Sequence, residues 1–424
     1  MVLKMRKMKD SGIEWIGEIP EGWETCLYKY CCSVQPGYPF DSAKFSNSST
    51  DGFPLIRIRD ITSGEIQTYY TGEYPPNYIV TAGDLLVGMD GDFNVRWWNN
   101  DAALLNQRCC RVTEKDSVLR RFLYYVLPFT LQHINTLTYA TTVKHLANGD
   151  ILNSFIAFPS LPAQQNIVHY LDTVCSEIDA MLSKTRSSIE EYKKLKQAVI
   201  TQAVTKGVRG EREMKDSGVE WIGEIPEEWG ISRIKYVSIF EPSCDFRKLT
   251  PETIITYAPM ECIKNGTFER RTSLYGNLAH TLTPFQDGDI VMAKVTPCFE
   301  NGNIAIMNEL QSGYGLGSSE LFVFRPQNIN TKYLFYWLQN KLFVHQACAT
   351  MTGTGGLKRI SPSFVKNCNI HYPPAAEQEE IADYLDAKCT EIDKLIAKKE
   401  QLVKELESYK KSLIYEVVTG KREV

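Results

Sequence analysis

Two long stretches of the chain carry an apolar residue at every third or fourth position, the spacing that puts these side chains on one face of an α-helix. The first stretch follows Pro162 and ends before Gly207, and the second follows Pro374 and ends before Gly420. Proline near a helix start and glycine just past its end are common boundary residues. The pattern therefore predicts two helices of about forty residues, each a rod of roughly 60 Å at about 1.5 Å per residue.

An apolar stripe of that length needs a partner surface, because a single helix cannot bury it. Each rod could pack on its neighbouring globular region, but we favour pairing of the two matching rods as a coiled coil. Paired rods would act as a spacer of fixed length. The residues predicted to form this contact are Leu171, Ile178, Ile189, Tyr192 and Val199 in the first rod, and Leu385, Ile392, Leu402, Leu406 and Leu413 in the second.

The segments 24–160 and 230–372, named domain 1 and domain 2 below, show a different pattern. Short β-branched and aromatic runs alternate with turn-forming residues, as strands do. FPLIRIRDI, DLLVGM, TIITYAPM, DIVMAKV and ELFVFRP predict strands, whereas RRFLYYVL and KYLFYWLQ predict helices. This mixture is typical of an α+β domain. The pairs Gly83-Asp84 and Gly288-Asp289 occupy matching places, so we expect one fold with two different surfaces.

The chain contains an internal repeat. The head phrase MKDSGIEWIGEIPEGW at 8–23 returns as MKDSGVEWIGEIPEEW at 214–229, and YLDTVCSEID in the first rod returns as YLDAKCTEID in the second. A head phrase, a globular domain and a long helix thus form one module that occurs twice. The expected organisation is an N-terminal repeat segment at 1–23, globular domains at 24–160 and 230–372, a helix and linker at 161–212 with the second head phrase to 229, and a helical segment at 373–424.

Composition is that of a folded protein, with 43% apolar and 23% charged residues among 424. No stretch has the roughly 18 apolar residues of a membrane span, and the charged start MVLKMRKMKDSG does not look like a signal peptide. We therefore expect a cytoplasmic protein that does not contact membranes. The 12 cysteines lack the spacing of zinc ligands, so no metal site is expected.

Sequence motifs for catalysis are absent. There is no GxxxxGK[S/T] phosphate loop and no HExxH, and GYGLG at 313–317 lacks the spacing of a dinucleotide fingerprint. The Pro-Pro pairs in YPPN and YPPA do not match the Asn/Asp-Pro-Pro-aromatic loop of an adenine methyltransferase. Asp-Gly-Asp at 90–92 and 287–289 has no lysine or histidine close by in sequence, which makes a nuclease site a poor interpretation. We expect any catalysis to reside in other chains.

Together these features resemble the specificity subunit of a Type I restriction–modification enzyme. The resemblance rests on SGxEWIGEIPExW at both repeat starts, on GDLLVGMDGDFN and GDIVMAKVTPCFENGN in the two domains, and on QQNIVHYLD and EQEEIADYLD at the helix starts. It implies two target recognition domains that each recognise half of a gapped DNA sequence, separated by antiparallel helices in a pseudo-two-fold molecule. It also implies two docked methyltransferase subunits and restriction and translocase subunits, with S-adenosylmethionine, ATP and Mg²⁺ used by those partners and no cofactor in this chain.

Candidate DNA contacts follow from side-chain chemistry, since Arg or Lys suits guanine, Asn or Gln suits adenine, and Asp or Glu can accept from cytosine. Two loops in each domain carry such residues, and small residues near the second loop allow a close approach to phosphate. A solvated turn is the alternative reading of each loop. The candidates are Asp90, Asp92, Asn94, Arg96, Thr142, Lys144 and His145 in domain 1, and Lys294, Thr296, Asn301, Asn303, Lys358 and Arg359 in domain 2.

Four further arginines are weaker candidates, because an arginine in a strand usually lies on a solvated face; they are Arg57, Arg59, Arg270 and Arg271. The charge distribution also limits DNA affinity. Domain 1 has 11 Lys and Arg against 13 Asp and Glu, domain 2 has 14 against 10, and the whole chain has a net charge of −4. We therefore expect the isolated chain to bind DNA modestly, with partners neutralising most of the contacted phosphates.

Two other functions remain open at this stage. A self-contained DNA enzyme would show methyl transfer or cleavage by the purified chain alone. A coiled-coil scaffold that binds only proteins would leave the polar loops of both domains without a role, and it would give no sequence-specific DNA complex.

Overall fold

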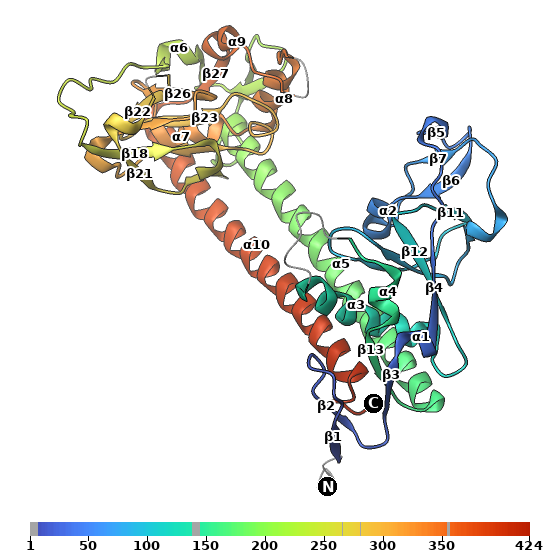
Figure 1. The fold of residues 1–424 in the computed structure, drawn as a ribbon. Helices are drawn as coiled ribbons and strands as arrows, with labels where there is room; N and C mark the ends of the chain where they lie inside the picture. Colours follow the sequence, from blue (N-terminus) through green and yellow to red (C-terminus); the bar gives the residue numbers. More distant parts are fainter. Residues whose placement is uncertain (1–6, 138–144, 265, 280, 354–356) are drawn as a thin grey trace. The chain divides into compact units, whose positions relative to one another are not determined.

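A computed structural model describes residues 7–137, 145–264, 266–279, 281–353 and 357–424. Its contacts divide the chain into two compact units, of which unit 1 comprises 1–184 and 402–424, and unit 2 comprises 185–401. Each unit therefore contains one globular domain together with part of each long helix, α5 (Leu161–Lys206) and α10 (Ala375–Val418), as Figure 1 shows.

Domain 1 contains two sheets and a group of helices. One sheet has the strand order β5-β7-β6-β11-β8 and the other β10-β9-β12-β4, and only β6 and β11 pair in parallel. A separate pair, β3 and β13, joins the start of the domain to its end. The elements are β3 (Glu24–Leu27), α1 (Tyr28–Cys31), β4 (Cys32–Pro36), β5 (Phe45–Ser46), β6 (Phe53–Ile56), α2 (Ile58–Ser63), β7 (Tyr69–Tyr70), β8 (Ile79–Val80), β9 (Leu85–Gly88), β10 (Val95–Trp97), β11 (Ala103–Leu105), β12 (Cys109–Glu114), α3 (Arg120–Leu137), α4 (Asn148–Leu152) and β13 (Phe155–Phe158).

Domain 2 repeats this topology with different residues. Its sheets have the orders β21-β18-β25-β22 and β24-β23-β26-β17, and again only the pair β18 and β25 is parallel within them. Because all strands of the domain 1 sheets except β5 have a counterpart here, the prediction that the two domains share one fold is confirmed. The elements are β16 (Gly230–Arg233), α6 (Ile234–Val237), β17 (Ser238–Phe240), β18 (Ile254–Ala258), β19 (Ile263–Lys264), β20 (Thr267–Phe268), β21 (Arg271–Leu274), β22 (Thr283–Gln286), β23 (Ile290–Ala293), β24 (Ile304–Ile306), β25 (Tyr314–Gly317), β26 (Leu321–Pro326), α7 (Thr331–Trp337), α8 (Lys341–Ala349), α9 (Pro362–Asn367) and β27 (Asn369–Tyr372).

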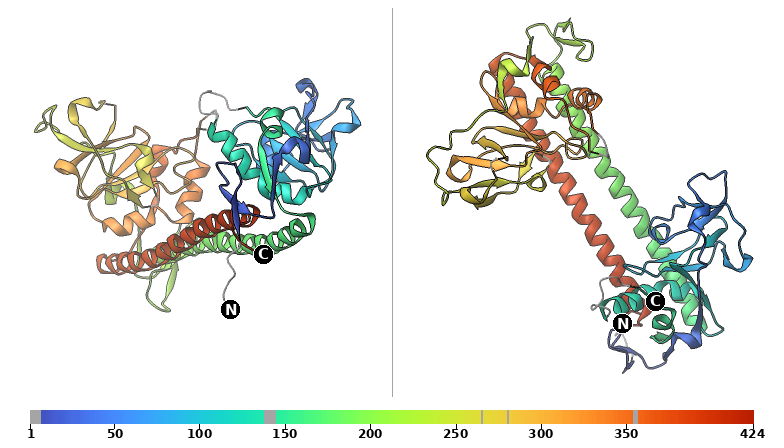
Figure 2. Two further views of the ribbon diagram at one scale, coloured as in Figure 1. Left: turned by 60° about the horizontal axis from the view of Figure 1, so that its bottom comes forward. Right: turned by 45° about the horizontal axis from the view of Figure 1, so that its top comes forward.

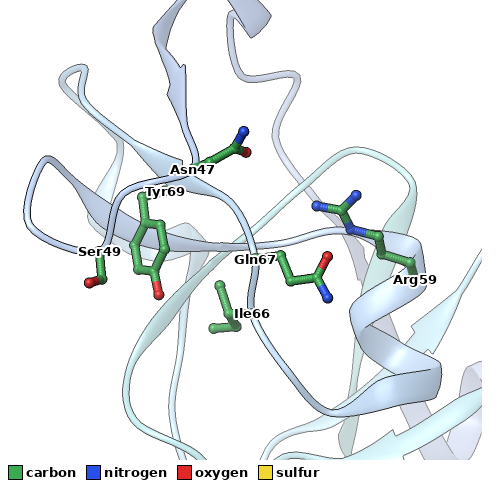
Figure 3. Close-up of a pocket in the computed structure, with 6 residues that line it drawn as sticks. All are labelled: Asn47, Ser49, Arg59, Ile66, Gln67 and Tyr69. Carbon is green, nitrogen blue, oxygen red and sulfur yellow. The ribbon is translucent and has the colours of Figure 1, made fainter. Parts of the chain in front are cut away.

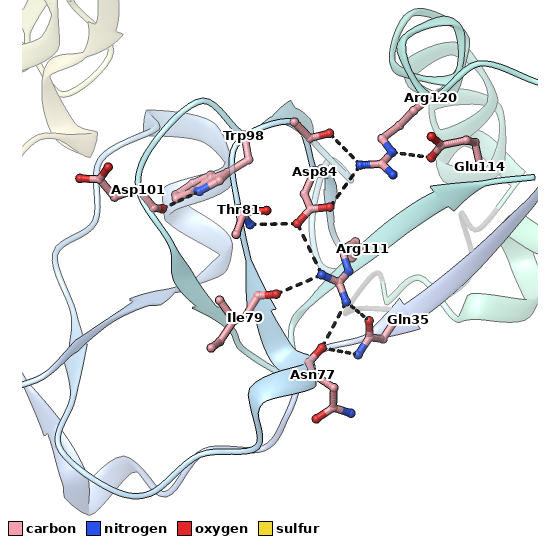
Figure 4. A network of polar contacts seen from close by, with 11 residues as sticks. Gln35, Asn77, Ile79, Thr81, Asp84, Trp98, Asp101, Arg111, Glu114 and Arg120 are labelled. Carbon is pink, nitrogen blue, oxygen red and sulfur yellow. Dashed lines mark hydrogen bonds and ion pairs between the residues drawn. The ribbon is translucent and has the colours of Figure 1, made fainter.

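The Gly-Asp pair that recurs in both domains stabilises a turn before a central strand. Asp84, just before β9, accepts a hydrogen bond of 2.9 Å from the backbone N–H of Thr81 and so closes the turn. Its carboxylate also lies 3.4 Å from Arg111 of β12 and 3.4 Å from Arg120 at the start of α3 (Figure 4). One aspartate therefore ties a turn, a strand and a helix together.

Asp289 has the same role in domain 2, where the turn precedes β23. It accepts from the backbone N–H of Gln286 at 2.8 Å and from two nitrogens of Arg325, each at 2.8 Å. Asp289 is fully buried, and such bidentate pairing is how a buried carboxylate is compensated. Gly83 and Gly288 precede the aspartates with φ of 94° and 85°, a conformation that favours glycine.

One predicted strand is too long. The run FPLIRIRDI forms a strand only from Phe53 to Ile56, and helix α2 follows at once. Asp60 explains the change, because its carboxylate accepts from the backbone N–H of Arg57 at 2.8 Å and caps the helix start. Gly64, with φ of 80°, ends the helix in the left-handed conformation. The other predicted strands and helices of both domains are present.

The two long helices pair within each unit. In unit 2, Lys196 of α5 bonds Asp393 of α10 at 2.7 Å, and Lys399 lies 5.7 Å from the ring centroid of Tyr192. Residue numbers rise along one helix as they fall along the other, so the helices are antiparallel there. In unit 1, Asp179 of α5 lies 2.6 Å from Lys410 of α10. From one ion pair to the other, the residue number rises by 17 in α5 and falls by 17 in α10, as expected for antiparallel helices.

Apolar residues of the two long helices also pack together within each unit. In unit 1, Leu171 and Ile178 of α5 belong to one buried cluster with Leu413 of α10 and with the helices of domain 1. In unit 2, Val204 of α5 shares a cluster with Leu385 of α10 and with domain 2. Both expected partners are therefore used, because each rod packs on the other rod and on a globular domain.

The two head phrases form matching hairpins. Strand β1 (Met8–Asp10) pairs with β2 (Glu18–Pro20), and β14 (Met214–Asp216) pairs with β15 (Glu224–Pro226), in the same register. Each hairpin buries its last two isoleucines and its last tryptophan, which are Ile16, Ile19 and Trp23 in the first phrase and Ile222, Ile225 and Trp229 in the second. Figure 2 gives two further views of the helices and hairpins.

Candidate nucleic-acid interface

The two predicted loops of domain 1 meet each other. Asp90, after β9, forms an isolated antiparallel bridge with His145, and its carboxylate lies 2.7 Å from Nδ1 of that histidine. Arg108 approaches the same carboxylate at 3.4 Å. Asp90 is thus engaged inside the domain, whereas Asp92 is exposed at the tip of the loop. Thr142 and Lys144 lie outside the described residues.

Asn94 and Arg96 lie against helix α2. Nε of Arg96 donates to the carbonyl of Ile61 at 2.5 Å and Nη2 to that of Thr62 at 2.6 Å, so this side chain satisfies carbonyls at the C-terminal end of the helix. Nδ2 of Asn94 donates to Oγ1 of Thr62 at 3.2 Å. A contact of Arg96 with a base would require the guanidinium to leave these carbonyls, so the structure gives it a positioning role for α2.

The loops of domain 2 are joined at the corresponding place. Val295 and Arg359 form an isolated antiparallel bridge, and Oγ1 of Thr296 accepts from the backbone N–H of Lys358 at 2.9 Å. Arg359 binds Glu320 through two nitrogens at 2.9 Å and 2.8 Å. This pairing lowers the pKa of the Glu320 carboxyl, which stays ionised. Lys358 remains exposed.

Three candidates of domain 2 have other surroundings. Lys294 extends over the ring of Phe322, with Nζ 5.5 Å from its centroid. Asn301 and Asn303 line a pocket together with Lys196 and Asp393 of the long helices, all within unit 2. The structure therefore joins the two loops of each domain, but it does not gather all candidates on one surface.

Most residues predicted for helix pairing are buried. The fully or nearly buried ones are Leu171, Ile178, Ile189, Leu385, Ile392 and Leu413. Tyr192, Val199 and Leu406 are half-buried. Leu402 differs, because its side chain is 42% exposed.

A polar pocket in domain 1 was missed by reasoning from sequence. It has a volume of about 550 Å³, and Figure 3 shows the six residues that line it: Asn47, Ser49, Arg59, Ile66, Gln67 and Tyr69. Arg59 comes from helix α2 rather than from the expected strand. Asp60 in the first turn, with Gly64 after the last turn, could have identified this helix in the sequence.

The family model for the Type I restriction modification DNA specificity domain matches residues 20–191 and again residues 226–407, so each match covers one globular domain and part of the long helix that follows it. The chain belongs to this family. The matched ranges correspond to the two copies of the repeated topology.

Named relatives in this family agree with the match. The EcoBI specificity subunit of Escherichia coli is 34% identical over 229 residues, which cover 53% of this chain and 48% of that one. The EcoAI specificity subunit of Escherichia coli is 35% identical over 163 residues, 37% of this chain and 27% of that one. The chain thus spans half or less of the length of these relatives. The MjaVIII specificity subunit of Methanocaldococcus jannaschii is 24% identical, with 99% of this chain and 98% of that one covered.

A solved structure supports the fold. A chain from work on complex assembly and conformational transition of the type I R-M system superposes with a TM-score of 0.68 at 16% identity, over 95% of this chain and 99% of that chain. That chain therefore shares the fold of two tandem α+β domains and two long helices.

Proposed function

We propose that this chain recognises a two-part, gapped DNA sequence, with one half-site bound by each domain. The main support is that domains 1 and 2 have the same strand topology but carry different polar groups at equivalent places. Residues that recognise bases must differ when the half-sites differ, whereas the scaffold that presents them need not. The EcoBI, EcoAI and MjaVIII relatives bear the name of specificity subunits of restriction enzymes. The bounds of domains 1 and 2 remain predictions.

The long helices supply the spacing in this proposal. Helix α5 is continuous from Leu161 to Lys206 and passes from unit 1 into unit 2. Antiparallel pairing with α10 stiffens it in both units, through the ion pairs of Asp179 and of Lys196. A rigid spacer of this kind suits half-sites about one duplex turn apart, roughly 34–36 Å.

The repeated surfaces favour two copies of one partner. Both head hairpins keep the same pairing, and each is followed by an exposed Lys-Tyr pair. The tyrosines Tyr30 and Tyr236 are 64% and 63% exposed, and the preceding lysine lies 5.1 Å from the ring centroid in each case. Exposed tyrosines are frequent anchors in protein interfaces. Since the two domains otherwise differ in sequence, a shared exposed pair suits one protein bound twice.

Catalysis belongs to the partners in this proposal. Two methyltransferase subunits would use S-adenosylmethionine, and restriction and translocase subunits would use ATP and Mg²⁺. This chain would bind the DNA without reacting with it, because its sequence carries no methyltransferase or phosphate-loop motif. No helix in the described ranges has the length and apolar character to span a membrane, and we propose a cytoplasmic location.

The deciding experiment is to map methylated adenines in the genome of cells that express the chain with its methyltransferase partner. The proposal expects one two-part motif. Exchanging residues 24–160 for the equivalent domain of another family member should change one half of that motif and leave the other intact. A partner complex without any sequence-specific DNA binding would instead support the coiled-coil scaffold. Methylation by the purified chain alone would support a self-contained enzyme.

A further inference from the structure

The polar pocket of domain 1 presents three planar hydrogen-bonding groups to solvent. Asn47 follows β5, Gln67 precedes β7 and Arg59 lies on α2, so three segments converge on the pocket (Figure 3). Within the described residues, the side-chain amides of Asn47 and Gln67 have no hydrogen-bond partner. Unused amide groups of this kind can each offer a donor and an acceptor to a ligand.

Contacts within the domain fix the position of the Arg59 guanidinium. Its Nη2 donates to Oγ1 of Thr68 at 2.9 Å, and its Nε lies 3.5 Å from Oδ1 of Asp60. Asp60 is fully buried and is itself fixed by the capping bond from the backbone of Arg57. These contacts leave Nη1 without a partner among the described residues, so one edge of the guanidinium is available to the pocket. A guanidinium fixed in advance loses little side-chain entropy when it binds.

These groups match the edges of bases better than they match phosphate. A guanidinium edge donates to O6 and N7 of guanine, and a carboxamide pairs with N6 and N7 of adenine. A phosphate site would be expected to gather several cations, whereas Arg59 is the one cation that lines this pocket within the described residues. Tyr69 and Ile66 are half-buried beside the polar groups and add an apolar wall against which a thymine methyl group can pack.

The corresponding place in domain 2 is different. Strand β18 is the counterpart of β6, because each pairs in parallel with the equivalent strand of its sheet. The residues that follow β18 are Pro259, Met260 and Glu261, where Arg57, Ile58 and Arg59 follow β6, so an acidic residue stands in the place of Arg59. Met260 packs against the buried core of domain 2. The pocket is therefore a feature that the two domains do not share, as expected for a group that recognises only one half-site.

We propose that Arg59, Gln67 and Asn47 form a base-recognition site of domain 1 that binds guanine and adenine edges of a duplex. Asp60 and Thr68 position Arg59, and Arg96 holds the end of the helix that carries it. This inference rests on the proposed function, since it names the residues that select one half-site.

The test compares methylation motifs in cells that express the partner subunit with the full-length chain carrying Arg59→Ala, Gln67→Ala or, as a control, Lys44→Ala. Lys44 is an exposed cation directly before β5 and does not line the pocket, so its replacement controls for the loss of a positive charge. The first two variants should accept other bases at one or two neighbouring positions of one half-site. Each should lose roughly 5- to 150-fold discrimination there, the range for a good bidentate contact. The other half-site and the control should keep full stringency.

Other outcomes have defined meanings. Full stringency at both half-sites in Arg59→Ala and Gln67→Ala overturns the inference and leaves the proposed function intact. Weaker methylation at all sites with an unchanged motif also overturns it, because a phosphate contact acts in that way. Arg59→Ala leaves the buried Asp60 without its side-chain partner, so Gln67→Ala provides the test that does not depend on this ion pair. If the wild-type chain directs no two-part motif, the proposed function itself fails.

Discussion

Lengthening both rods should widen the gap between the two half-sites. The ion pair of Lys196 and Asp393 fixes which positions face each other, so four residues inserted after Lys193 are matched by four inserted after Leu395. Both insertions fall between this ion pair and that of Asp179 and Lys410, which keeps the pairing on each side. Four helical residues add about 6 Å and turn the helix roughly 40° beyond one full turn. Because duplex DNA rises about 3.4 Å per base pair, the gap should grow by at most about two base pairs, and by fewer if the rods are inclined to the DNA.

The assay is motif mapping in cells, with the wild-type chain and the doubly inserted chain each expressed with the methyltransferase partner. Both half-sites should keep their sequences while the gap lengthens by one or two base pairs. Insertion after Lys193 alone is the control, since it shifts α5 against α10 and should reduce methylation and thermal stability. An unchanged gap in an active, doubly inserted chain would refute the role of the helices as spacer.

Three further predictions concern stability and affinity. His371 is buried, and its pKa is lowered to about 3, first by desolvation and then by the charge of Lys206. Below pH 6.5 the unfolded state therefore takes up a proton on this histidine that the folded state does not bind. The free energy of unfolding should fall by about 1.4 kcal/mol per pH unit between pH 6.5 and about 4 for this reason. His371→Gln should flatten this part of the profile in denaturant titrations, and an identical profile would contradict the assignment. Leu385→Ala, at a fully buried position, should cost about 2–5 kcal/mol, whereas Leu402→Ala, at a side chain 42% exposed, should cost far less; equal losses would argue against the described packing. For the isolated chain, fluorescence anisotropy between about 50 and 200 mM salt should show a shallow dependence of DNA affinity, and a logarithmic slope steeper than about −5 would contradict the charge argument.

Long periodic elements and repeated phrases were predictable because they depend on many residues at once. The rods are specified by apolar positions over more than ten helical turns each, so single polar interruptions such as Lys196 do not obscure them. The shared fold of the two domains could be predicted from a few matching residues. Two of these residues, Asp84 and Asp289, close the equivalent turn in each domain. The burial of individual rod residues was less predictable, as Leu402 shows, because the rods also contact the globular domains.

The candidate site was harder to predict because a side chain's role depends on contacts distant in sequence. Arg96 follows a glycine-containing loop and has suitable chemistry for guanine, yet it satisfies the carbonyls of Ile61 and Thr62, more than thirty residues earlier. Arg59 was assigned to a solvated strand, yet a local cap at Asp60 turns the chain into a helix and points this arginine to the pocket. Sequence chemistry found the right residue types, whereas tertiary contacts decided which of them are available.

The contact between the two loops of each domain shows how specificity can diverge on one fold. The backbone bridge is the same in both, joining Asp90 to His145 and Val295 to Arg359. The side chains at the bridge are not the same, since His145 lies against a carboxylate of its own bridge partner, whereas Arg359 reaches Glu320 before the neighbouring strand β26. A bridge made by backbone groups does not depend on which side chains surround it. The loops can therefore change their outward-facing residues while the scaffold stays intact, which is the property that a protein needs if its two domains are to recognise different DNA sequences.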